Sequence, residues 1–200
     1  MKLLLTMRLF IGLDIEDGIR QRIARFMEGV REFAPAARWV RPESLHLTLK
    51  FIGEKPSQAV ANIKRLLAGI DAQPLELAFR GYGFFPSPKS ARVFWVGIDS
   101  GPQLAALAGS VDDAIERLGI AKEDHAFSPH LTVARGGGSG SPRRQAYDRA
   151  NQNFQRLQEK LAGLPAPEFG TMTAREFFLY QSQLSSGGSR YSKLERFVLR

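Results

Sequence analysis

The sequence predicts an α+β fold with mostly antiparallel sheets, and three observations lead to this prediction. Strand and helix patterns are mixed along the chain, and two pairs of strand patterns follow each other without a helix between them. The segment 92–99 is apolar at both odd and even positions, as expected of a central strand. The tetrapeptide His-Leu-Thr-Leu at His46 recurs 84 positions later as His-Leu-Thr-Val at His130, each within a strand–helix pattern. We therefore expect an internal duplication with pseudo-two-fold symmetry, in a single two-lobed domain that spans residues 1–200.

The chain begins with an apolar run at 7–14, which we assign to a strand. A signal peptide is disfavoured because Arg8 interrupts the run and no small-residue cleavage site follows. A helix is expected over 17–33, ending before Pro35, because its apolar residues recur with helical spacing. These residues are Ile19, Ile23, Phe26, Val30 and Phe33.

The first motif strand is expected over 45–52 and should be broken by Gly53. Ser57 is placed to cap a second helix. The apolar face of that helix consists of Val60, Ile63, Leu67 and Ile70.

Two strands, 75–85 and 92–99, follow in the middle of the chain, joined by a turn at Pro86-Ser87-Pro88. A third helix is expected over 102–118, with Gly119 as its terminator. Its apolar stripe consists of Leu104, Leu107, Val111, Ile115 and Leu118.

The second motif strand is expected over 128–135. A glycine- and serine-rich loop, Gly136 to Ser141, comes next, and a polar helix that ends near Leu161 follows it. Two final strands are expected near 173–183 and 191–199.

Composition points to a polyanionic partner. The chain has 28 Lys and Arg against 20 Asp and Glu, a formal net charge of +8, and a sequence pI of about 10.1. This excess favours RNA, DNA or a nucleotide, although a basic surface also serves solubility alone. The absence of cysteine excludes disulfides, thiolate metal sites and a Cys nucleophile. No apolar run approaches the roughly 20 residues needed to cross a bilayer, so we expect a cytoplasmic protein without a membrane partner.

Strand alternation gives each motif two different faces. In the first copy His46, Thr48 and Lys50 share one side, and in the second His130 and Thr132 do. The opposite, core-facing set is Leu45, Leu47, Leu49 and Phe51 in the first copy and Leu131 and Val133 in the second.

Two imidazoles and two hydroxyls in one cavity suit proton transfer around a phosphate. A Thr hydroxyl can donate to a phosphate oxygen, and a His can supply or remove a proton near neutral pH. Two imidazoles on opposite sides of a phosphorus can act as general base and general acid, each role worth about 10²–10⁴ in rate. The near symmetry leaves open which histidine has which role. One His-x-Thr alone usually marks an ordinary strand, but two copies that use two of three histidines favour catalysis.

This pattern resembles the two-histidine phosphoesterase superfamily, and within it the RNA 2′,3′-cyclic phosphodiesterases, also called 2′-5′ RNA ligases. The resemblance covers nearly the whole chain. It rests on Arg8-Leu9-Phe10-Ile11, on His46-Leu47-Thr48-Leu49-Lys50-Phe51-Ile52-Gly53-Glu54, on Pro129-His130-Leu131-Thr132-Val133-Ala134-Arg135, on Phe178-Leu179-Tyr180-Gln181-Ser182, and on Gly187 or Gly188, Tyr191 and Leu194.

The resemblance implies a bilobal fold with one motif strand per lobe facing a central cleft, and hydrolysis of a terminal 2′,3′-cyclic phosphate to a 2′-phosphate. It implies that His46 is the proton donor to the departing 3′ oxygen and His130 the proton acceptor that activates water. Thr48 and Thr132 would hold the non-bridging oxygens. A 5′-hydroxyl in place of water would give 2′-5′ ligation in the reverse direction. No metal or other cofactor is expected, and the resemblance suggests a monomer whose partner is RNA or a cyclic nucleotide.

Further residues are candidates for substrate binding. Alternation puts Arg135 off the histidine face, but strand twist or the loop after it can turn it toward phosphate, as the resemblance suggests. Lys50 either adds positive charge beside His46 or is a solvated edge residue. Of Phe10, Tyr180 and Tyr191, at most one is expected to stack a base, the others belonging to the core.

Two other features of the sequence give weaker evidence of a functional site. His125 and Asp124 lack a third ligand for a metal ion. The run Gly136-Gly137-Gly138 lacks the Gly-Lys-Ser/Thr ending of a nucleotide-binding loop, so we expect a flexible loop that touches RNA with Arg143 and Arg144.

Two alternative functions stay open. The same site would suit another substrate, such as ADP-ribose cyclic phosphate, a 2′-5′ oligonucleotide or a cyclic nucleotide. A module that binds RNA ends without turnover is a different class of protein, against which the retention of both His and both Thr argues.

Overall fold

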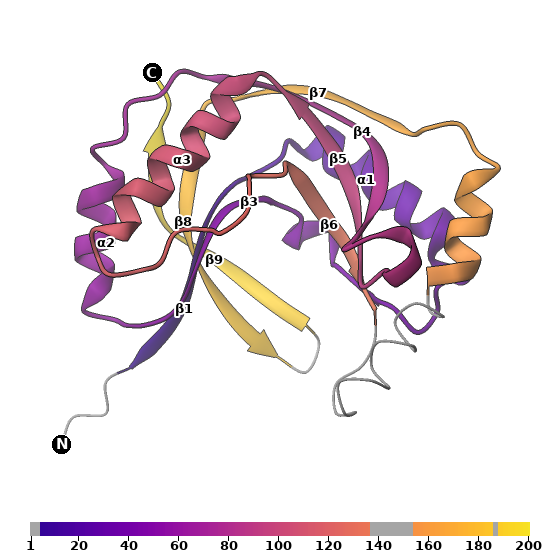
Figure 1. Ribbon diagram of the computed structural model, residues 1–200, viewed down its shortest axis with the longest axis horizontal. Coiled ribbons are helices and arrows are strands. Elements are labelled where there is room, and N and C mark those ends of the chain that lie inside the picture. The colour runs from indigo at the N-terminus through magenta and orange to yellow at the C-terminus, as the bar shows by residue number, and fades with distance from the viewer. Residues whose placement is uncertain (1–4, 137–153, 186–187) are drawn as a thin grey trace.

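The computed structural model describes residues 5–136, 154–185 and 188–200, which form two antiparallel sheets (Figure 1). The first sheet has four strands in the order β3-β1-β8-β9, and the second has five in the order β2-β6-β5-β4-β7. The four-stranded sheet contains β1 (Thr6–Leu13), β3 (Leu47–Pro56), β8 (Glu176–Ser185) and β9 (Gly188–Val198). The five-stranded sheet contains β2 (Arg38–Trp39), β4 (Leu75–Phe85), β5 (Val93–Ser100), β6 (His130–Arg135) and β7 (Glu168–Ala174). The predicted α+β class with antiparallel pairing is confirmed.

The helices tie the two sheets to each other. They are α1 (Asp17–Val30), α2 (Ala59–Leu67), α3 (Pro102–Glu116) and a helix over 154–162, with 3₁₀ turns η1 (Arg31–Phe33), η2 (Pro42–Ser44) and η3 (Pro88–Ser90). Helix α1 follows a strand of the four-stranded sheet, yet its Phe26 ring lies 5.3 Å from Phe169 of the five-stranded sheet. Helix α3 follows a strand of the five-stranded sheet, yet its Asp112 lies 2.6 Å from Lys50 of β3. Each of these two helices therefore packs against the sheet to which the strand before it does not belong.

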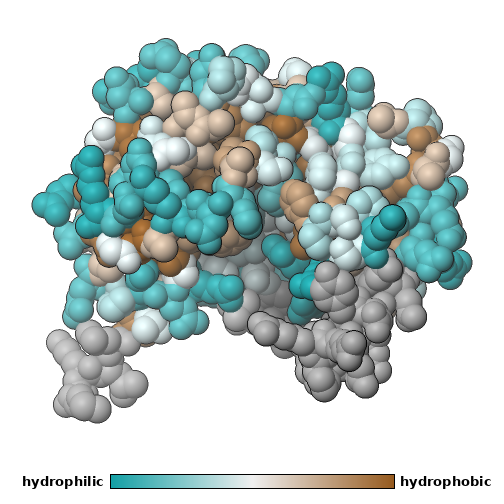
Figure 2. All heavy atoms as spheres, viewed as in Figure 1, coloured by the Kyte–Doolittle hydropathy of each residue, from teal (hydrophilic) through white to brown (hydrophobic). Residues whose placement is uncertain are grey.

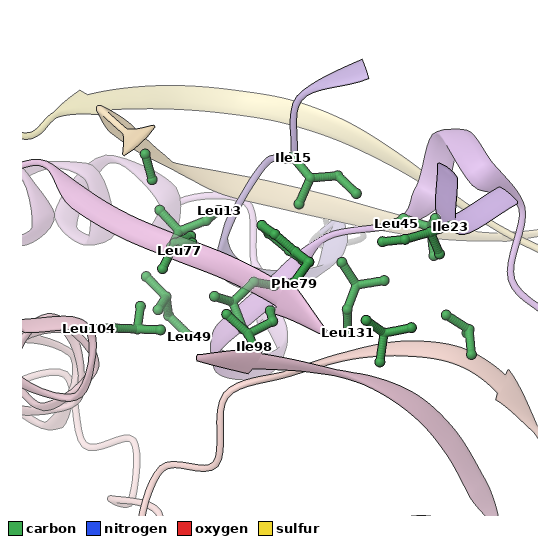
Figure 3. Packing of buried hydrophobic residues seen from close by; sticks show 14 of the residues in the cluster. Leu13, Ile15, Ile23, Leu45, Leu49, Leu77, Phe79, Ile98, Leu104 and Leu131 are labelled. Atoms are coloured by element: carbon green, nitrogen blue, oxygen red, sulfur yellow. The ribbon is translucent and has the colours of Figure 1, made fainter. Parts of the chain in front are cut away.

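One hydrophobic core joins the two sheets. In Figure 3, Leu13 and Leu49 of the four-stranded sheet lie close to Leu77, Ile98 and Leu131 of the five-stranded sheet. Fully burying one such side chain stabilises a fold by about 1.5–3 kcal/mol. The sheets are thus held together by the aliphatic halves of both motif strands, which leaves the His and Thr halves on the other face.

The two sheets repeat one plan. Each motif strand pairs antiparallel with the strand that precedes the long helix before it, β3 with β1 and β6 with β5. The central position expected for 92–99 is confirmed, because β5 is the third of five strands. Gly119 ends the third helix with φ of +71°, a conformation that favours glycine.

Three predicted details are wrong. Gly53 does not break the first motif strand, because its φ of +80° accommodates a bulge and β3 continues through it. The strand expected at 173–183 is two strands, β7 and β8, which belong to different sheets and are separated at Arg175. Ser57 makes no side-chain cap, since α2 begins one residue later with Gln58 as its N-cap.

Within the described ranges, no helix combines the length and the apolar character that membrane crossing requires. The space-filling view shows polar and charged residues over much of one face, which is hollowed between the two halves (Figure 2). The predicted loop beyond Gly136, with Arg143 and Arg144, lies outside the described residues.

Candidate active site

Each motif histidine is held by the backbone two residues before it. His46 directly precedes β3, and its Nδ1 lies 2.8 Å from the carbonyl oxygen of Ser44. His130 begins β6, and its Nδ1 lies 2.8 Å from the carbonyl oxygen of Ser128. A carbonyl oxygen only accepts hydrogen bonds, so Nδ1 carries the hydrogen in both rings. The Nε2 atom of each neutral ring is therefore the atom left to accept a proton.

A glycine lies beside each motif on the neighbouring strand, and it makes room for the motif strand at Gly12 and for β4 at Gly97. A Cβ atom on Gly12 of β1 would lie 2.6 Å from the carbonyl oxygen of Leu47 and 3.6 Å from the ring of His46. Gly97 of β5 pairs with His130, and a Cβ there would lie 2.5 Å from a carbonyl oxygen of β4. Any side chain at either position would force backbone apart, so the close approach requires glycine.

A β-bulge follows the Thr of each motif. The register shifts at Leu49 in the β1–β3 pair and at Val133 in the β5–β6 pair. In each case the next residue, Lys50 or Ala134, is buried as well, so two consecutive side chains lie on the core side. The strict alternation expected from the sequence is therefore inverted beyond both bulges. Thr48 and Thr132, which come before the bulges, are half-buried.

Lys50 was expected on the face of His46, and this expectation is wrong. The bulge turns the side chain to the core, where it is only 3% exposed. Its Nζ lies 2.6 Å from Asp112 and 3.3 Å from Glu123, and it donates to the carbonyl oxygen of Ala121 at 2.7 Å. Lys50 thus joins β3 to α3 and to the segment that leads into β6.

The same inversion puts Phe51 and Arg135 on the side of the histidines. Phe51, expected in the core, is 57% exposed, and its ring lies 6.1 Å from that of Phe10. Arg135, expected off the histidine face, is exposed, and its positive charge contributes to lowering the pKa of both His46 and His130. One guanidinium therefore lies near both imidazoles.

Partial burial is the main reason why the pKa of each motif histidine lies below its usual 6.5. The bonds to the Ser44 and Ser128 carbonyls act in the opposite direction. The rings differ in two charged neighbours, since the carboxylate of Asp14 raises the pKa of His46 and the guanidinium of Arg20 lowers it by less, whereas neither contributes to the shift of His130.

The sequence did not indicate a pair of charged residues, Asp14 and Arg20, that lies against the segment carrying His46. The guanidinium of Arg20, on α1, donates to the carbonyl oxygens of Pro42 at 2.8 Å and Leu45 at 3.1 Å. It also donates to Oδ1 of Asp14 at 2.6 Å. These bonds fix the segment that carries His46 against the end of β1. No local pattern singles out either residue, because their partners come from a different part of the chain.

Three aromatic rings surround His46. The ring of Phe10 lies 4.6 Å from His46 and stacks on Tyr180 at 4.8 Å. Phe10 is only 2% exposed, so its predicted role as a base-stacking residue does not fit the structure. Tyr191 is half-buried and meets His46 edge-on at 4.9 Å. A pocket of about 200 Å³ opens here, lined by His46, Tyr180 and Tyr191 and by the charged side chains of Asp14 and Lys193.

Two further rings lie beside His130, and the sequence did not single them out. Phe85 meets the imidazole edge-on at 4.8 Å, and Trp95 lies 6.4 Å from it. Trp95 comes from β5, which pairs with β6, and Phe85 comes from β4, the strand beyond β5, so their position follows from sheet order and from no motif.

The third histidine, His125, is exposed in the segment between α3 and β6. Over the described parts of the chain, no three His, Asp or Glu side chains converge as metal ligands. Of the candidates, Arg135 lies near both motif histidines and Tyr191 lies beside His46. Thr48 and Thr132 are half-buried, each two residues after its histidine, whereas Lys50 and Phe10 are turned inward.

A family model described as LigT-like phosphoesterase matches residues 13–95 and, again, residues 96–191. Each match contains one His-x-Thr motif, in agreement with the expected internal duplication.

Several relatives align over nearly their full length. The RNA 2′,3′-cyclic phosphodiesterase of Archaeoglobus fulgidus is 34% identical over 191 residues, covering 96% of this chain and 99% of the relative. The protein of the same name from Methanothermobacter thermautotrophicus is 32% identical over 199 residues, covering 98% and 100%. Among solved structures, Escherichia coli LigT complexed with 3′-AMP superposes with a TM-score of 0.75 at 26% identity, covering 98% and 99% of the two chains. A Thermus thermophilus protein superposes with a TM-score of 0.74 at 29% identity, covering 97% and 98%.

Proposed function

The chain belongs to the LigT-like phosphoesterase family, and we propose that it is an RNA 2′,3′-cyclic phosphodiesterase that produces a 2′-phosphate. The observation that carries this proposal is the matched pair of imidazoles. Each has Nδ1 bound to a backbone carbonyl and Nε2 left for proton transfer, and one arginine lies near both. A bound phosphate would therefore have one proton-transfer group from each sheet.

In the proposed reaction, Nε2 of His130 takes a proton from water as the water oxygen bonds to phosphorus. The bond between phosphorus and the 3′ oxygen breaks, and Nε2 of His46 protonates that oxygen, leaving a 2′-phosphate. This direction is supported by Asp14, whose carboxylate favours the protonated form of His46 and affects His130 less. An alcohol in place of water, such as an RNA 5′-hydroxyl, would run the chemistry toward a 2′-5′ linkage.

Charge on the phosphate is balanced by protein groups in this proposal. The hydroxyls of Thr48 and Thr132 donate to the non-bridging oxygens, and the guanidinium of Arg135 supplies the positive charge. Tyr191 lines the pocket beside His46 and can contact the terminal nucleoside. Because proton transfer and charge stabilisation both come from side chains, we propose a metal-independent reaction. We also propose a cytoplasmic monomer.

The test is turnover of a short oligoribonucleotide that ends in a 2′,3′-cyclic phosphate, in the presence of a chelator. We expect a 2′-phosphate product. His125→Ala serves as the matched control for His46→Ala and His130→Ala, because the third histidine is exposed and outside the motifs. A 3′-phosphate product, or binding of the RNA without any turnover, would overturn the proposal in favour of a different chemistry or of an RNA-end-binding module.

A further inference from the structure

One guanidinium holds both ends of the turn in front of His46. The 3₁₀ turn η2 ends at Ser44, whose carbonyl oxygen lies 2.8 Å from Nδ1 of His46. Nη1 of Arg20 donates to the carbonyl oxygen of Pro42, which begins this turn, at 2.8 Å. It also donates to the carbonyl oxygen of Leu45, which follows the turn, at 3.1 Å. The carbonyl that binds the imidazole therefore lies between two carbonyls that a single side chain holds.

The guanidinium of Arg20 is itself held from the opposite side. Its Nη2 donates to Oδ1 of Asp14 at 2.6 Å and to the carbonyl oxygen of Ile15 at 3.0 Å, both just beyond the end of β1. The second carboxylate oxygen of Asp14 accepts from Nζ of Lys193, on β9, at 2.5 Å. The side chain of Arg20 is only 15% exposed, so protein acceptors take the place of water around it. The turn is thus tied, through one side chain, to two strands of the four-stranded sheet.

The carbonyl of Ser44 decides which nitrogen of His46 carries the hydrogen. A neutral imidazole exists as two tautomers, and the hydrogen bond made by one ring nitrogen sets the state of the other. With Nδ1–H bound to the carbonyl, Nε2 accepts a proton in the neutral ring and donates one in the protonated ring. If the carbonyl turned away, the hydrogen could move to Nε2, and the ring could rotate about its broad side-chain torsion. A displacement of about 1 Å in a reacting group can cost about 10² in rate.

We propose that Arg20 is a positioning residue for His46. By holding the turn at both ends, it keeps the Ser44 carbonyl where Nδ1–H of His46 binds it, and so presents Nε2 to the substrate. Arg20 acts through this backbone and needs no contact with the phosphate. These bonds lie on the His46 side, so His130 should be unaffected. The consequence for turnover rests on the proposed function, whereas the consequence for the tautomer does not.

A lysine in place of Arg20 would keep the charge and lose the clamp on the turn. A guanidinium is planar and has five N–H donors in a fixed fork, whereas an ammonium has three donors on one atom. Lysine can therefore pair with Asp14 but cannot also reach both carbonyls of the turn. Arg20→Lys thus separates positioning from charge. Its matched control is Arg22→Lys, because Nε of Arg22, on the same helix, donates to the carbonyl oxygen of Phe169 in the other sheet.

The experiment measures the tautomer of each imidazole in the full chain by NMR of the ring nitrogens, at a pH where the rings are neutral. In the wild type, His46 and His130 should both carry the hydrogen on Nδ1. In Arg20→Lys, part of the His46 population should carry it on Nε2, while His130 keeps the wild-type state. In Arg22→Lys, both rings should stay as in the wild type. A His46 ring that keeps Nδ1–H in Arg20→Lys, or a change of equal size at His130, would overturn the proposal.

A measurement on the wild type tests the clamp even if Arg20→Lys does not fold. Hydrogen bonds on both sides of the guanidinium should stop its rotation, so that the Nη hydrogens of Arg20 give separate NMR signals. Those of the exposed Arg25, on the same helix, should average. Averaged signals for Arg20 would overturn the proposal without any variant.

Turnover tests whether the position of His46 matters for the reaction. On an oligoribonucleotide 2′,3′-cyclic phosphate, Arg20→Lys should lower kcat about ten-fold, the value of about one hydrogen bond, and leave KM near that of the wild type. Arg22→Lys should change neither constant. A wild-type kcat in Arg20→Lys, or a loss confined to KM, would overturn the positioning role. If the wild type has no turnover at all, the proposed function is wrong, and the His46 tautomer in Arg20→Lys still decides the role of Arg20.

Discussion

His46 and His130 occupy the same position in their motifs, but His46 lies among more charged and aromatic groups. Both rings donate Nδ1–H to the carbonyl two residues before them, both face a glycine-containing strand, and both precede a bulge. Only His46 has the Asp14 carboxylate close by, and it contacts three rings where His130 contacts two. The backbone plan is duplicated, whereas the electrostatic surroundings are not.

The residues after the bulges differ in the same way. The buried position holds Lys50 in one copy and Ala134 in the other, and the next, outward position holds Phe51 or Arg135. One strand thus contributes an internal ion pair and an exposed ring, and the other contributes a guanidinium near both histidines. The difference teaches that neighbours outside the repeat decide which of two similar histidines donates a proton and which accepts one.

The largest expected effect tests what the two motifs share. His46→Ala and His130→Ala should each lower kcat/KM by about 10²–10⁴, because each removes one proton-transfer group. Steady-state kinetics on an oligoribonucleotide 2′,3′-cyclic phosphate measures this, with His125→Ala expected near wild type. If one histidine variant kept wild-type activity, the two halves would not be equivalent partners in catalysis.

A smaller loss is expected at the threonines. Thr48→Val and Thr132→Val keep side-chain shape and remove a hydroxyl, and each should lower kcat by about 10², as for the loss of one donor to a developing charge. Thr171→Val, an exposed position on β7, is the matched control. Similar losses in both variants would show that the two threonines contribute equally to phosphate binding, as the two histidines do to proton transfer. A loss in one variant alone would show that only the histidines have equivalent roles.

The third prediction concerns the difference between the histidines. Both pKa values lie below 6.5, so the optimum of kcat/KM, midway between them, should lie on the acid side of pH 6.5. Asp14→Asn removes the carboxylate that raises the pKa of His46, so the pKa of His46 should fall and the optimum should move to lower pH. NMR titration of the two rings checks the assignment. A shift of His130 in place of His46, or an optimum that moves upward, would contradict the proposed asymmetry.

The smallest effect on turnover is expected at Lys50. Lys50→Met leaves Asp112 without its buried partner, which should reduce the free energy of unfolding by about 2 kcal/mol, less than for a fully buried pair because Asp112 is partly exposed. Urea denaturation measures this change. Lys122→Gln, which removes an exposed ion-pair partner, should leave the unfolding midpoint within error. A loss of activity in Lys50→Met without a loss of stability would indicate that Lys50 acts in substrate binding, contrary to its position in the structure.

Much of the fold was predictable because it depends on local patterns. Helical spacing located α1 and α3, and alternation located both motif strands and the core set around Leu47 and Leu131. The predicted directions of the Phe51 and Lys50 side chains were wrong, because a bulge inserts one extra residue and so exchanges the inward and outward positions that follow it. It also merged β7 with β8, whose apolar residues run on through a change of sheet at Arg175.

The sequence by itself determined the chemistry of this protein: two His-x-Thr strands, an aliphatic face to bury them, and a family resemblance that the comparisons confirm. Only the tertiary structure decided which other side chains lie near the two motifs. It turned Arg135 outward and Lys50 inward, brought Asp14 to one histidine, and paired Arg38 with Arg135 across two strands. The reason is that a motif is a property of neighbours in the chain, whereas strand register, bulges and electrostatic contacts depend on which strands pair in space.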